Sequence, residues 1–193
     1  VNTCVVDDTP EPVKPDAVFP NNWVSWHADG TVVLYPMQAA NRRPERRREI
    51  LDQVAAASGY RIVRTLELTA HEREGRYLEG TGSLVLDRLH GTAYAARSAR
   101  THQLALAEFS RLTGYRVVEF DASLGSGAVY HTNVLMSLGR DFAILCSEAI
   151  GDPVARQSVC TELGATNRSL VEVSGDQVRR FAANCLEVDS AGG

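Results

Sequence analysis

Four small polar residues recur at one spacing in this chain, and their side chains could do chemistry together. Each lies eight residues before the turn of a predicted hairpin: Asn22 before Gly30, Ser83 before Gly91, Asn133 before Asp141 and Asn184 before Gly192. Amides and hydroxyls donate and accept hydrogen bonds without carrying charge. If the repeats surround an axis, these residues converge on it and line a polar site. If they only end strands and form turns, the same spacing results, and the pattern leaves both interpretations open.

Cysteine is the second residue type that could do chemistry, as a nucleophile or as a metal ligand. The four cysteines form no Cys-x-x-Cys pair, and three lie in apolar or helical stretches; they are Cys4, Cys146, Cys160 and Cys185. Such thiols are typical of a reducing compartment and not of a disulfide framework or a zinc site. We therefore predict a cytoplasmic protein, and we expect neither a metal nor an organic cofactor.

The composition predicts one globular domain over residues 1–193. The chain has 44% hydrophobic and 23% charged residues, which allows a substantial core. Its net charge of −4 gives no electrostatic reason to expect a nucleic-acid partner, and the basic run at 42–48 leads into a predicted helix, which indicates a solvated flank. No apolar run of about 20 residues suggests a membrane span, and the first residues lack the pattern of a secretory signal.

The elements that must position these residues follow a repeated order of strand, turn, strand, helix and strand. In the first copy, strands over 22–27 and 31–35 flank an Ala-Asp-Gly turn, which is a strong hairpin signal. A helix over 44–58 ends at Gly59, and a strand over 60–66 follows. Glycine suits that helix end because the left-handed backbone conformation there costs it least.

Two further copies follow, and a fourth begins. The second has strands over 83–88, 92–96 and 115–120 and a helix over 101–113; the third has strands over 133–138, 142–146 and 169–173 and a helix over 153–163. The near-duplicates at 58–63 and 113–118 mark the same helix-to-strand junction. The fourth opens at Asn184, after a short helix over 176–182, and stops inside its hairpin. We therefore expect a truncated domain of about three full units, with exposed apolar edges that favour a homodimer or a bound partner segment.

Three motifs carry a family resemblance. Phe-Pro-Asn-Asn-Trp at 19–23 leads into the hairpin segment at 29–37, Leu-Glu-Gly-Thr-Gly-Ser lies at 78–83, and Tyr-His-Thr-Asn-Val lies at 130–134. They resemble the arginine deiminase/amidinotransferase superfamily of guanidino-modifying enzymes, most closely its bacterial amidinotransferases and citrulline-utilisation hydrolases. The resemblance extends over residues 16–187. It implies a pentein fold, an α/β-propeller of ββαβ units that is incomplete in this chain.

The resemblance also implies a site. In that superfamily a cysteine attacks the guanidino or ureido carbon, a histidine transfers protons, and a glutamate binds the substrate nitrogens and orients the histidine. By motif, His131 and Glu79 match the catalytic pair, and Asn22 and Asn133 match two acidic residues that bind the substrate. The nucleophile belongs to a Gly-rich segment that this chain does not reach, and none of its four cysteines matches that segment. The remaining histidines match no motif, and we expect them on the surface or in turns: His27, His71, His90 and His102.

The two asparagines depart from the superfamily in a way that bears on the substrate. A buried cation needs carboxylates, whereas two carboxamides suit a neutral ureido group with its own C=O and N–H groups. We therefore predict a Cys-dependent hydrolase of C–N bonds in a small ureido or guanidino substrate, citrulline or an arginine-like compound. The alternatives are an amidinotransferase, in which an amine replaces water as the acceptor, and a non-catalytic module of the same architecture.

Overall fold

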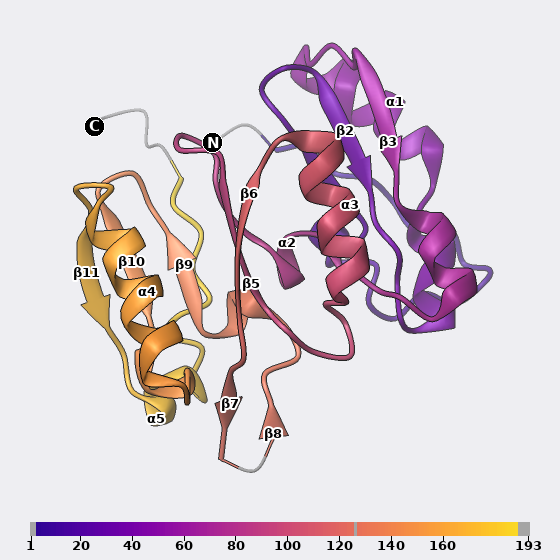
Figure 1. Cartoon of the computed structure of the whole chain (residues 1–193). Helices are drawn as coiled ribbons and strands as arrows, with labels where there is room; N and C mark the ends of the chain where they lie inside the picture. Colours follow the sequence, from indigo (N-terminus) through magenta and orange to yellow (C-terminus); the bar gives the residue numbers. More distant parts are fainter. Residues whose placement is uncertain (1–2, 126, 189–193) are drawn as a thin grey trace.

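Three three-stranded sheets follow one another along the chain in the computed structural model, which describes residues 3–125 and 127–188. The centre of each sheet is the second strand of a hairpin, which runs antiparallel to the first strand and parallel to a third strand that returns after a helix. Figure 1 shows the sheets in chain order across the molecule, with α3 lying between the first and second sheets. The predicted α/β repeat of ββαβ units is therefore confirmed.

The first unit sets the pattern. It contains β1 (Val24–Trp26), β2 (Thr31–Leu34), α1 (Arg48–Ser58) and β3 (Arg64–Glu67). Its hairpin turn requires glycine at position 30, where φ is +82°. A Cβ on Gly30 would also lie 2.5 Å from a methyl carbon of Val63, so this turn can pack directly against the chain that enters β3.

The second and third units repeat this order with bounds close to those predicted. The second contains β4 (Val85–Asp87), β5 (Thr92–Ala96), α3 (Gln103–Thr113) and β6 (Arg116–Phe120). The third contains β9 (Met136–Leu138), β10 (Phe142–Leu145), α4 (Pro153–Gly164) and β11 (Ser169–Glu172). Between these two units lies a small hairpin that was not predicted, β7 (Ser123–Leu124) with β8 (Gly127–Ala128).

A short helix precedes each hairpin, and here the structure differs from the prediction. These helices are η1 (Pro20–Asn22), α2 (Gly80–Ser83) and η4 (Thr132–Val134). Asn22, Ser83 and Asn133 lie in these helices instead of opening strands. Since α2 contacts both η1 and η4, the three short helices that contain the equivalent polar residues lie together.

The predicted helix over 44–58 is shorter than expected. Pro44 lies inside η2 (Ala40–Glu45), and α1 begins only at Arg48. The break lies after Pro44, because the backbone leaves the helical conformation at Arg46 (ψ 70°) and Arg47 (ψ 115°) before α1 begins. The other short helices are η3 (Thr69–Glu74), η5 (Ser147–Ala149) and α5 (Gly175–Val178).

The fourth unit is not formed in the described residues. The helix predicted over 176–182 is present only as α5, and no strand begins at Asn184 before the last described residue, 188. The turn predicted at Gly192 lies outside the described residues. The three described sheets do not close into a ring.

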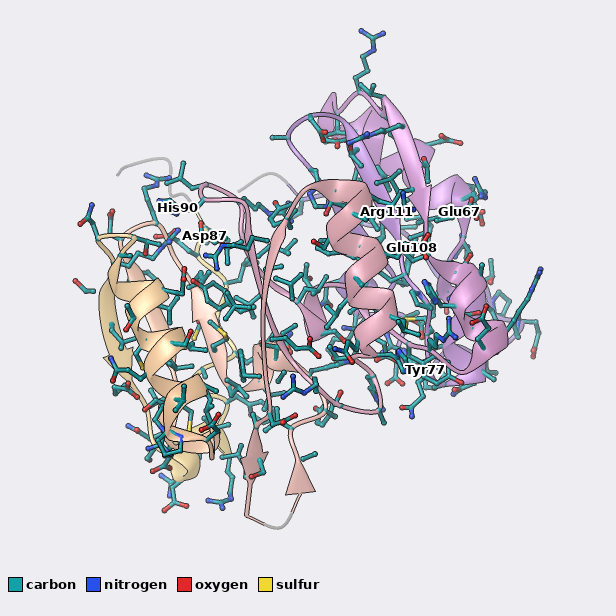
Figure 2. The ribbon with its side chains drawn as sticks, in the orientation of Figure 1. Glu67, Tyr77, Asp87, His90, Glu108 and Arg111 are labelled. Carbon is teal, nitrogen blue, oxygen red and sulfur yellow. The ribbon has the colours of Figure 1, made fainter. Side chains whose placement is uncertain are left out.

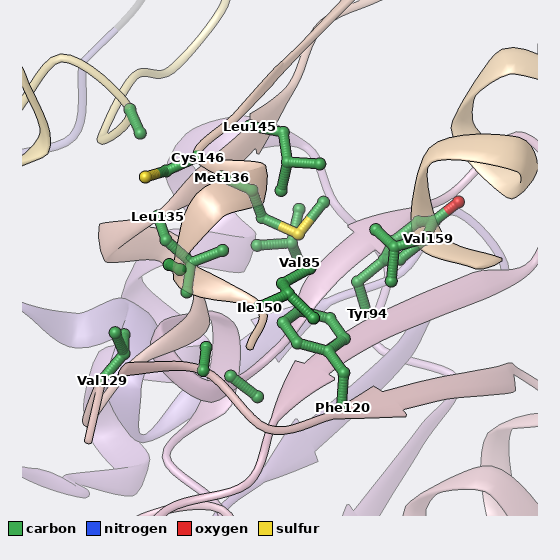
Figure 3. Packing of buried hydrophobic residues seen from close by; sticks show 14 of the residues in the cluster. Val85, Tyr94, Phe120, Val129, Leu135, Met136, Leu145, Cys146, Ile150 and Val159 are labelled. Carbon is green, nitrogen blue, oxygen red and sulfur yellow. The ribbon is translucent and has the colours of Figure 1, made fainter. Parts of the chain in front are cut away.

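The hydrophobic core is shared between neighbouring units. Because alternate residues of a strand point to opposite faces, Ala93 and Ala95 of β5 pack against the first unit, and Tyr94 and Ala96 pack against the third. Figure 3 shows this second cluster, in which Tyr94 of the second sheet and Met136 of the third belong to one core. The central strand β5 therefore joins the second unit to both of its neighbours.

The last strand of the third sheet, unlike the central strands, is exposed. All four residues of β11 are exposed, and Leu170 and Val171 are apolar. The exposed apolar edge that the repeat predicts is thus present at β11. No helix in residues 3–125 or 127–188 has the length and apolar character needed to cross a membrane.

Candidate functional site

Glu79 and His131 come from different units and meet in the interior. Nε2 of His131 donates a hydrogen bond to Oε2 of Glu79 over 2.7 Å. Glu79 is fully buried, and His131 is 6% exposed. Both residues lie immediately before a short helix, Glu79 before α2 and His131 before η4. Since those two helices are in contact, the repeat itself brings the pair together.

Three donors converge on the Glu79 carboxylate. Besides His131, the backbone N–H of Gln38 donates to Oε1 over 3.0 Å, and Nη1 of Arg100 donates to Oε2 over 3.3 Å. Burial acts to raise the pKa of Glu79. The hydrogen bonds from His131 and Gln38 and the charges of His131 and Arg100 outweigh this effect and lower that pKa. Glu79 is therefore ionised at neutral pH and can orient His131.

His131 has a second ring nitrogen that the fold leaves free. Because Nε2–H donates to Glu79, the neutral imidazole carries its lone pair on Nδ1. No group in the described part of the chain forms a hydrogen bond with Nδ1. This nitrogen can accept a proton and return it, which is the chemistry of a general base and acid.

Two glycines, Gly80 and Gly82, allow neighbouring atoms to lie close to the backbone beside Glu79 and His131. Gly80 has φ +43°, and a Cβ there would lie 2.2 Å from the carbonyl oxygen of Asn21. A Cβ on Gly82 would lie 2.5 Å from Nδ2 of Asn22 and 2.9 Å from Nδ1 of His131. Asn22 and His131 therefore border the same point, the position that a side chain on Gly82 would occupy.

Asn22 is buried, and an arginine orients its carboxamide. Nη1 of Arg42 donates to Oδ1 of Asn22 over 2.8 Å. Glu45 holds Arg42 through two hydrogen bonds of 2.9 Å each. Because a guanidinium only donates, the Asn22 atom that faces Arg42 is the oxygen, and Nδ2 faces Gly82.

The other predicted polar residues have different surroundings. Ser83 supports Glu79, since its hydroxyl accepts from the Glu79 N–H over 3.0 Å and donates to the Arg100 carbonyl over 2.7 Å. Asn133 is half-buried, two residues after His131, and its side chain makes no hydrogen bond within the described residues. Asn184 is exposed. The structure thus gathers Glu79, His131 and Asn22, while a binding role for Asn133 stays a prediction.

No cysteine belongs to this cluster. Burial raises the pKa of the Cys146 thiol, and Figure 3 shows this residue beside Leu135 and Met136 in the core, as predicted. Cys160 lies in α4, and Cys4 and Cys185 are exposed. None of the four, all of which lie in the described part of the chain, forms a hydrogen bond with Glu79 or His131. In that same part no group of three or more His, Cys, Asp or Glu residues could hold a metal ion.

The sequence did not indicate the roles of Arg42 and Arg100, or the burial of His27. Arg42 belongs to the basic run that indicated a solvated flank, yet it is only 4% exposed. Glu45 within that run was the available signal, because a carboxylate three residues away can pair with a buried arginine. Arg100 carries no comparable local signal. His27 opens the turn at 27–30, as the prediction allows, because its carbonyl oxygen accepts from the Gly30 N–H over 3.0 Å. Its side chain is buried and not at the surface, and it hydrogen-bonds Ser25 over 2.9 Å.

Comparisons with known structures show the fold. ArgZ, an arginine dihydrolase from the ornithine-ammonia cycle in cyanobacteria, superposes with a TM-score of 0.65 and 20% identity, over 93% of this chain and 26% of ArgZ. Unliganded AgrE gives 0.70 and 20% identity, over 94% of this chain and 24% of AgrE. A dimethylarginine dimethylaminohydrolase adduct with S-methyl-L-thiocitrulline gives 0.59 and 18% identity, over 89% and 58%. The chain thus spans about a quarter of ArgZ and AgrE.

A sequence comparison assigns the chain to a family, which these structural similarities alone do not. No curated protein matches the chain in a sequence search. A family model described as N,N dimethylarginine dimethylhydrolase, eukaryotic, matches residues 1–193. These comparisons do not name the bacterial citrulline-utilisation group, so that finer assignment stays a prediction. Because the family model matches the whole chain and the fold agrees, the protein belongs to the N,N-dimethylarginine dimethylhydrolase family, within the arginine deiminase/amidinotransferase (pentein) superfamily.

Proposed function

We propose that this protein acts in the Cys-dependent hydrolysis of a C–N bond in a small ureido or guanidino substrate, with His131 and Glu79 as its proton-transfer pair. One observation carries the proposal: the buried 2.7 Å hydrogen bond between Glu79 and His131 leaves Nδ1 of the histidine beside the Asn22 amide. A histidine oriented by a buried carboxylate, with one nitrogen free, is suited to general acid–base catalysis.

The proposed reaction has two steps. A cysteine thiolate attacks the ureido carbon of citrulline, and the bond from that carbon to the ornithine nitrogen breaks as His131 gives that nitrogen a proton. The carbamoyl thioester then reacts with water, which His131 deprotonates as it attacks. Carbamate leaves, and the thiolate is restored. None of the four cysteines in this chain adjoins the pair, so we propose that the thiol comes from outside these residues.

Citrulline is the substrate we favour over arginine. Asn22 and Asn133 are carboxamides at positions where the superfamily pattern has acids. A buried guanidinium with Glu79 as a partner, but without the two further acids of the superfamily pattern, would offset less of its desolvation cost, whereas a ureido group can exchange donors and acceptors with amides. An amidinotransferase would share the first step and differ only in its acceptor.

We propose three further properties of the intact protein. Its repeat closes into a pentein propeller, because each described unit packs on the next and β11 presents an apolar edge. It acts in the cytoplasm, which its four free cysteines favour. It forms a homodimer, for which exposed apolar residues provide a surface.

The test uses the protein at the length at which cells produce it. Citrulline, arginine and arginine plus glycine are supplied separately, and ornithine is measured with and without prior alkylation by iodoacetamide. We expect citrulline alone to yield ornithine. Prior alkylation should abolish this activity, and bound substrate should protect the activity from alkylation. Ornithine that appears only with arginine plus glycine would replace the hydrolase with a transferase. Turnover that survives complete alkylation of the cysteines would overturn the Cys-dependent mechanism.

A further inference from the structure

Arg42 lies directly behind Asn22 and has no part in the reaction proposed above. Its Nη1 donates to Oδ1 of Asn22, and its Nε and Nη2 donate to the two carboxylate oxygens of Glu45. Nη2 also lies within hydrogen-bond distance of the carbonyl oxygens of Asp16 (3.2 Å) and Phe19 (3.3 Å). Each of these partners is an acceptor, as a group that only donates requires.

This arrangement allows only one orientation of the Asn22 carboxamide. If the amide were rotated by half a turn, its NH2 group would face the Arg42 N–H groups, and buried donors would be left without acceptors. In the observed orientation Nδ2 points to the position that a Gly82 side chain would occupy, next to Nδ1 of His131. The site therefore receives an N–H donor from Asn22.

The arginine does not simply add positive charge to the site. Glu45 is 2% exposed and forms a two-bonded ion pair with Arg42, so the buried pair is close to neutral as a unit. Arg100 likewise donates to Oε2 of Glu79. Oδ1 of Asn22 faces Arg42, and Oε2 of Glu79 accepts from both His131 and Arg100, so these two atoms offer a guanidinium less acceptor capacity than free oxygens would.

We propose that Arg42 is a positioning residue that sets substrate choice. It holds Oδ1 of Asn22, presents Nδ2 to the substrate, and so selects a ureido C=O over a guanidinium. A guanidinium consists only of donors and would meet a donor, whereas a ureido oxygen accepts from it. The inference rests on the proposed function, whose site it deepens, and it assigns the discrimination to an arginine that never touches the reacting atoms.

The experiment compares three substitutions in the intact protein. Arg42→Lys keeps a donor-only side chain that can pair with Glu45. The double variant Arg42→Gln with Glu45→Gln replaces the ion pair by carboxamides, which donate or accept and so allow either orientation of Asn22. The matched control is Arg168→Gln with Asp87→Asn, which removes another buried two-bonded pair that does not touch Asn22. Calorimetric titrations with L-citrulline and with L-arginine give each dissociation constant, and ornithine release is measured in parallel.

We expect the unsubstituted protein to bind citrulline about 10- to 100-fold more tightly than arginine, as one buried hydrogen bond made or left unmade implies. Arg42→Lys and the control keep this ratio, and the Arg42/Glu45 double variant lowers it towards about one. A purely structural role for Arg42 would weaken both ligands equally. An unchanged ratio in the double variant, or no preference in the unsubstituted protein, would overturn the positioning role.

A further variant, Asn22→Asp, tests the inference if the double variant does not fold. Asn22→Asp keeps its bond to Arg42 and replaces the Nδ2 donor by an acceptor, so the ratio should shift towards arginine, and an unchanged ratio would again overturn the inference. Preference for citrulline without ornithine release would refute the hydrolase proposal and leave the positioning role standing. Ornithine release without a preference for citrulline would refute the positioning role and leave the hydrolase proposal standing. Binding of neither ligand would refute both proposals.

Discussion

Two buried clusters in this molecule contain the same three residue types, a carboxylate, a histidine and an arginine. The clusters are Glu79 with His131 and Arg100, and Asp87 with His90 and Arg168. Both carboxylate side chains are fully buried. Burial acts to raise both pKa values, but the hydrogen bonds from the basic partners outweigh it and lower them.

The clusters differ in which basic partner is buried. At Asp87 the arginine is buried and forms two hydrogen bonds of 2.6 and 3.1 Å. His90, which Figure 2 shows next to Asp87, is the exposed member, with 40% of its side chain accessible. At Glu79 the relation is reversed, because His131 is buried and the Arg100 side chain is 31% exposed.

This difference separates a structural link from a candidate catalytic pair. Arg168, which precedes β11, engages both oxygens of Asp87 in β4, and so ties the third unit to the second. At Glu79 one donor is a buried imidazole whose other nitrogen is free to exchange a proton. Residue types alone do not distinguish the two clusters; the burial of the histidine does.

The largest effect should follow from breaking the proposed catalytic pair. Glu79→Gln or His131→Gln should lower the rate of ornithine release from citrulline by about a hundredfold to ten-thousandfold, the range of general acid–base catalysis. Initial rates in the intact protein, with unfolding temperatures measured alongside, check this result. A rate within about threefold of the unsubstituted protein would show that the Glu79 cluster is structural like its counterpart.

Substitution in the Asp87 cluster should lower the stability of the protein and leave the rate of ornithine release unchanged. Asp87→Asn leaves Arg168 buried without its anion, and breaking a buried pair in this way costs about 3–5 kcal/mol. Urea unfolding measures the loss, and the rate per folded molecule should stay the same. Asp121→Asn is the control, because the Arg97–Asp121 pair is exposed and its loss should cost about 1 kcal/mol or less. A loss of turnover in folded Asp87→Asn protein would contradict the distinction between the clusters.

Replacing Asn22 and Asn133 by carboxylates should shift the preferred ligand from citrulline towards arginine. Asn22→Asp combined with Asn133→Asp adds carboxylate oxygens that a guanidinium can bind. We expect arginine binding to tighten by about tenfold or more relative to citrulline, measured as the ratio of dissociation constants. If arginine affinity does not increase, the two asparagines do not determine the choice between ureido and guanidino substrates.

The last prediction concerns His27, a buried histidine outside both clusters. Burial lowers its pKa from 6.5 to about 4. The folded protein therefore binds the proton less well than the unfolded chain, and stability should fall as the pH drops from about 6.5 to about 4. The carboxylates Glu79 and Asp87, whose pKa values are lowered, add a further loss below their ordinary values of 4.5 and 3.8. Urea unfolding across this range should show a weaker pH dependence between 6.5 and 4 in His27→Gln; an identical slope would exclude His27 as the source.

Local sequence patterns predicted most of the fold. The Asp-Gly turn at Gly30 and the helix end at Gly114 both have the positive φ that glycine favours, and the repeat fixed the order of strands and helices. The prediction was wrong where tertiary packing prevails over local pattern. Arg46 and Arg47 interrupt a helix that was predicted as continuous, and Asn22, read as the start of a strand, ends a short helix against α2.

What the sequence determined by itself is the repeat, and through its motifs the identities of Glu79, His131 and Asn22. Their types and order along the chain are local information. Only the tertiary structure decided which atoms of these residues remain free, because that depends on partners far away in sequence. Arg42 takes the oxygen of Asn22, Arg100 and Gln38 share the carboxylate of Glu79, and one nitrogen of His131 has no partner in the described residues. A hydrogen-bonding group is satisfied or free only once its surroundings are assembled.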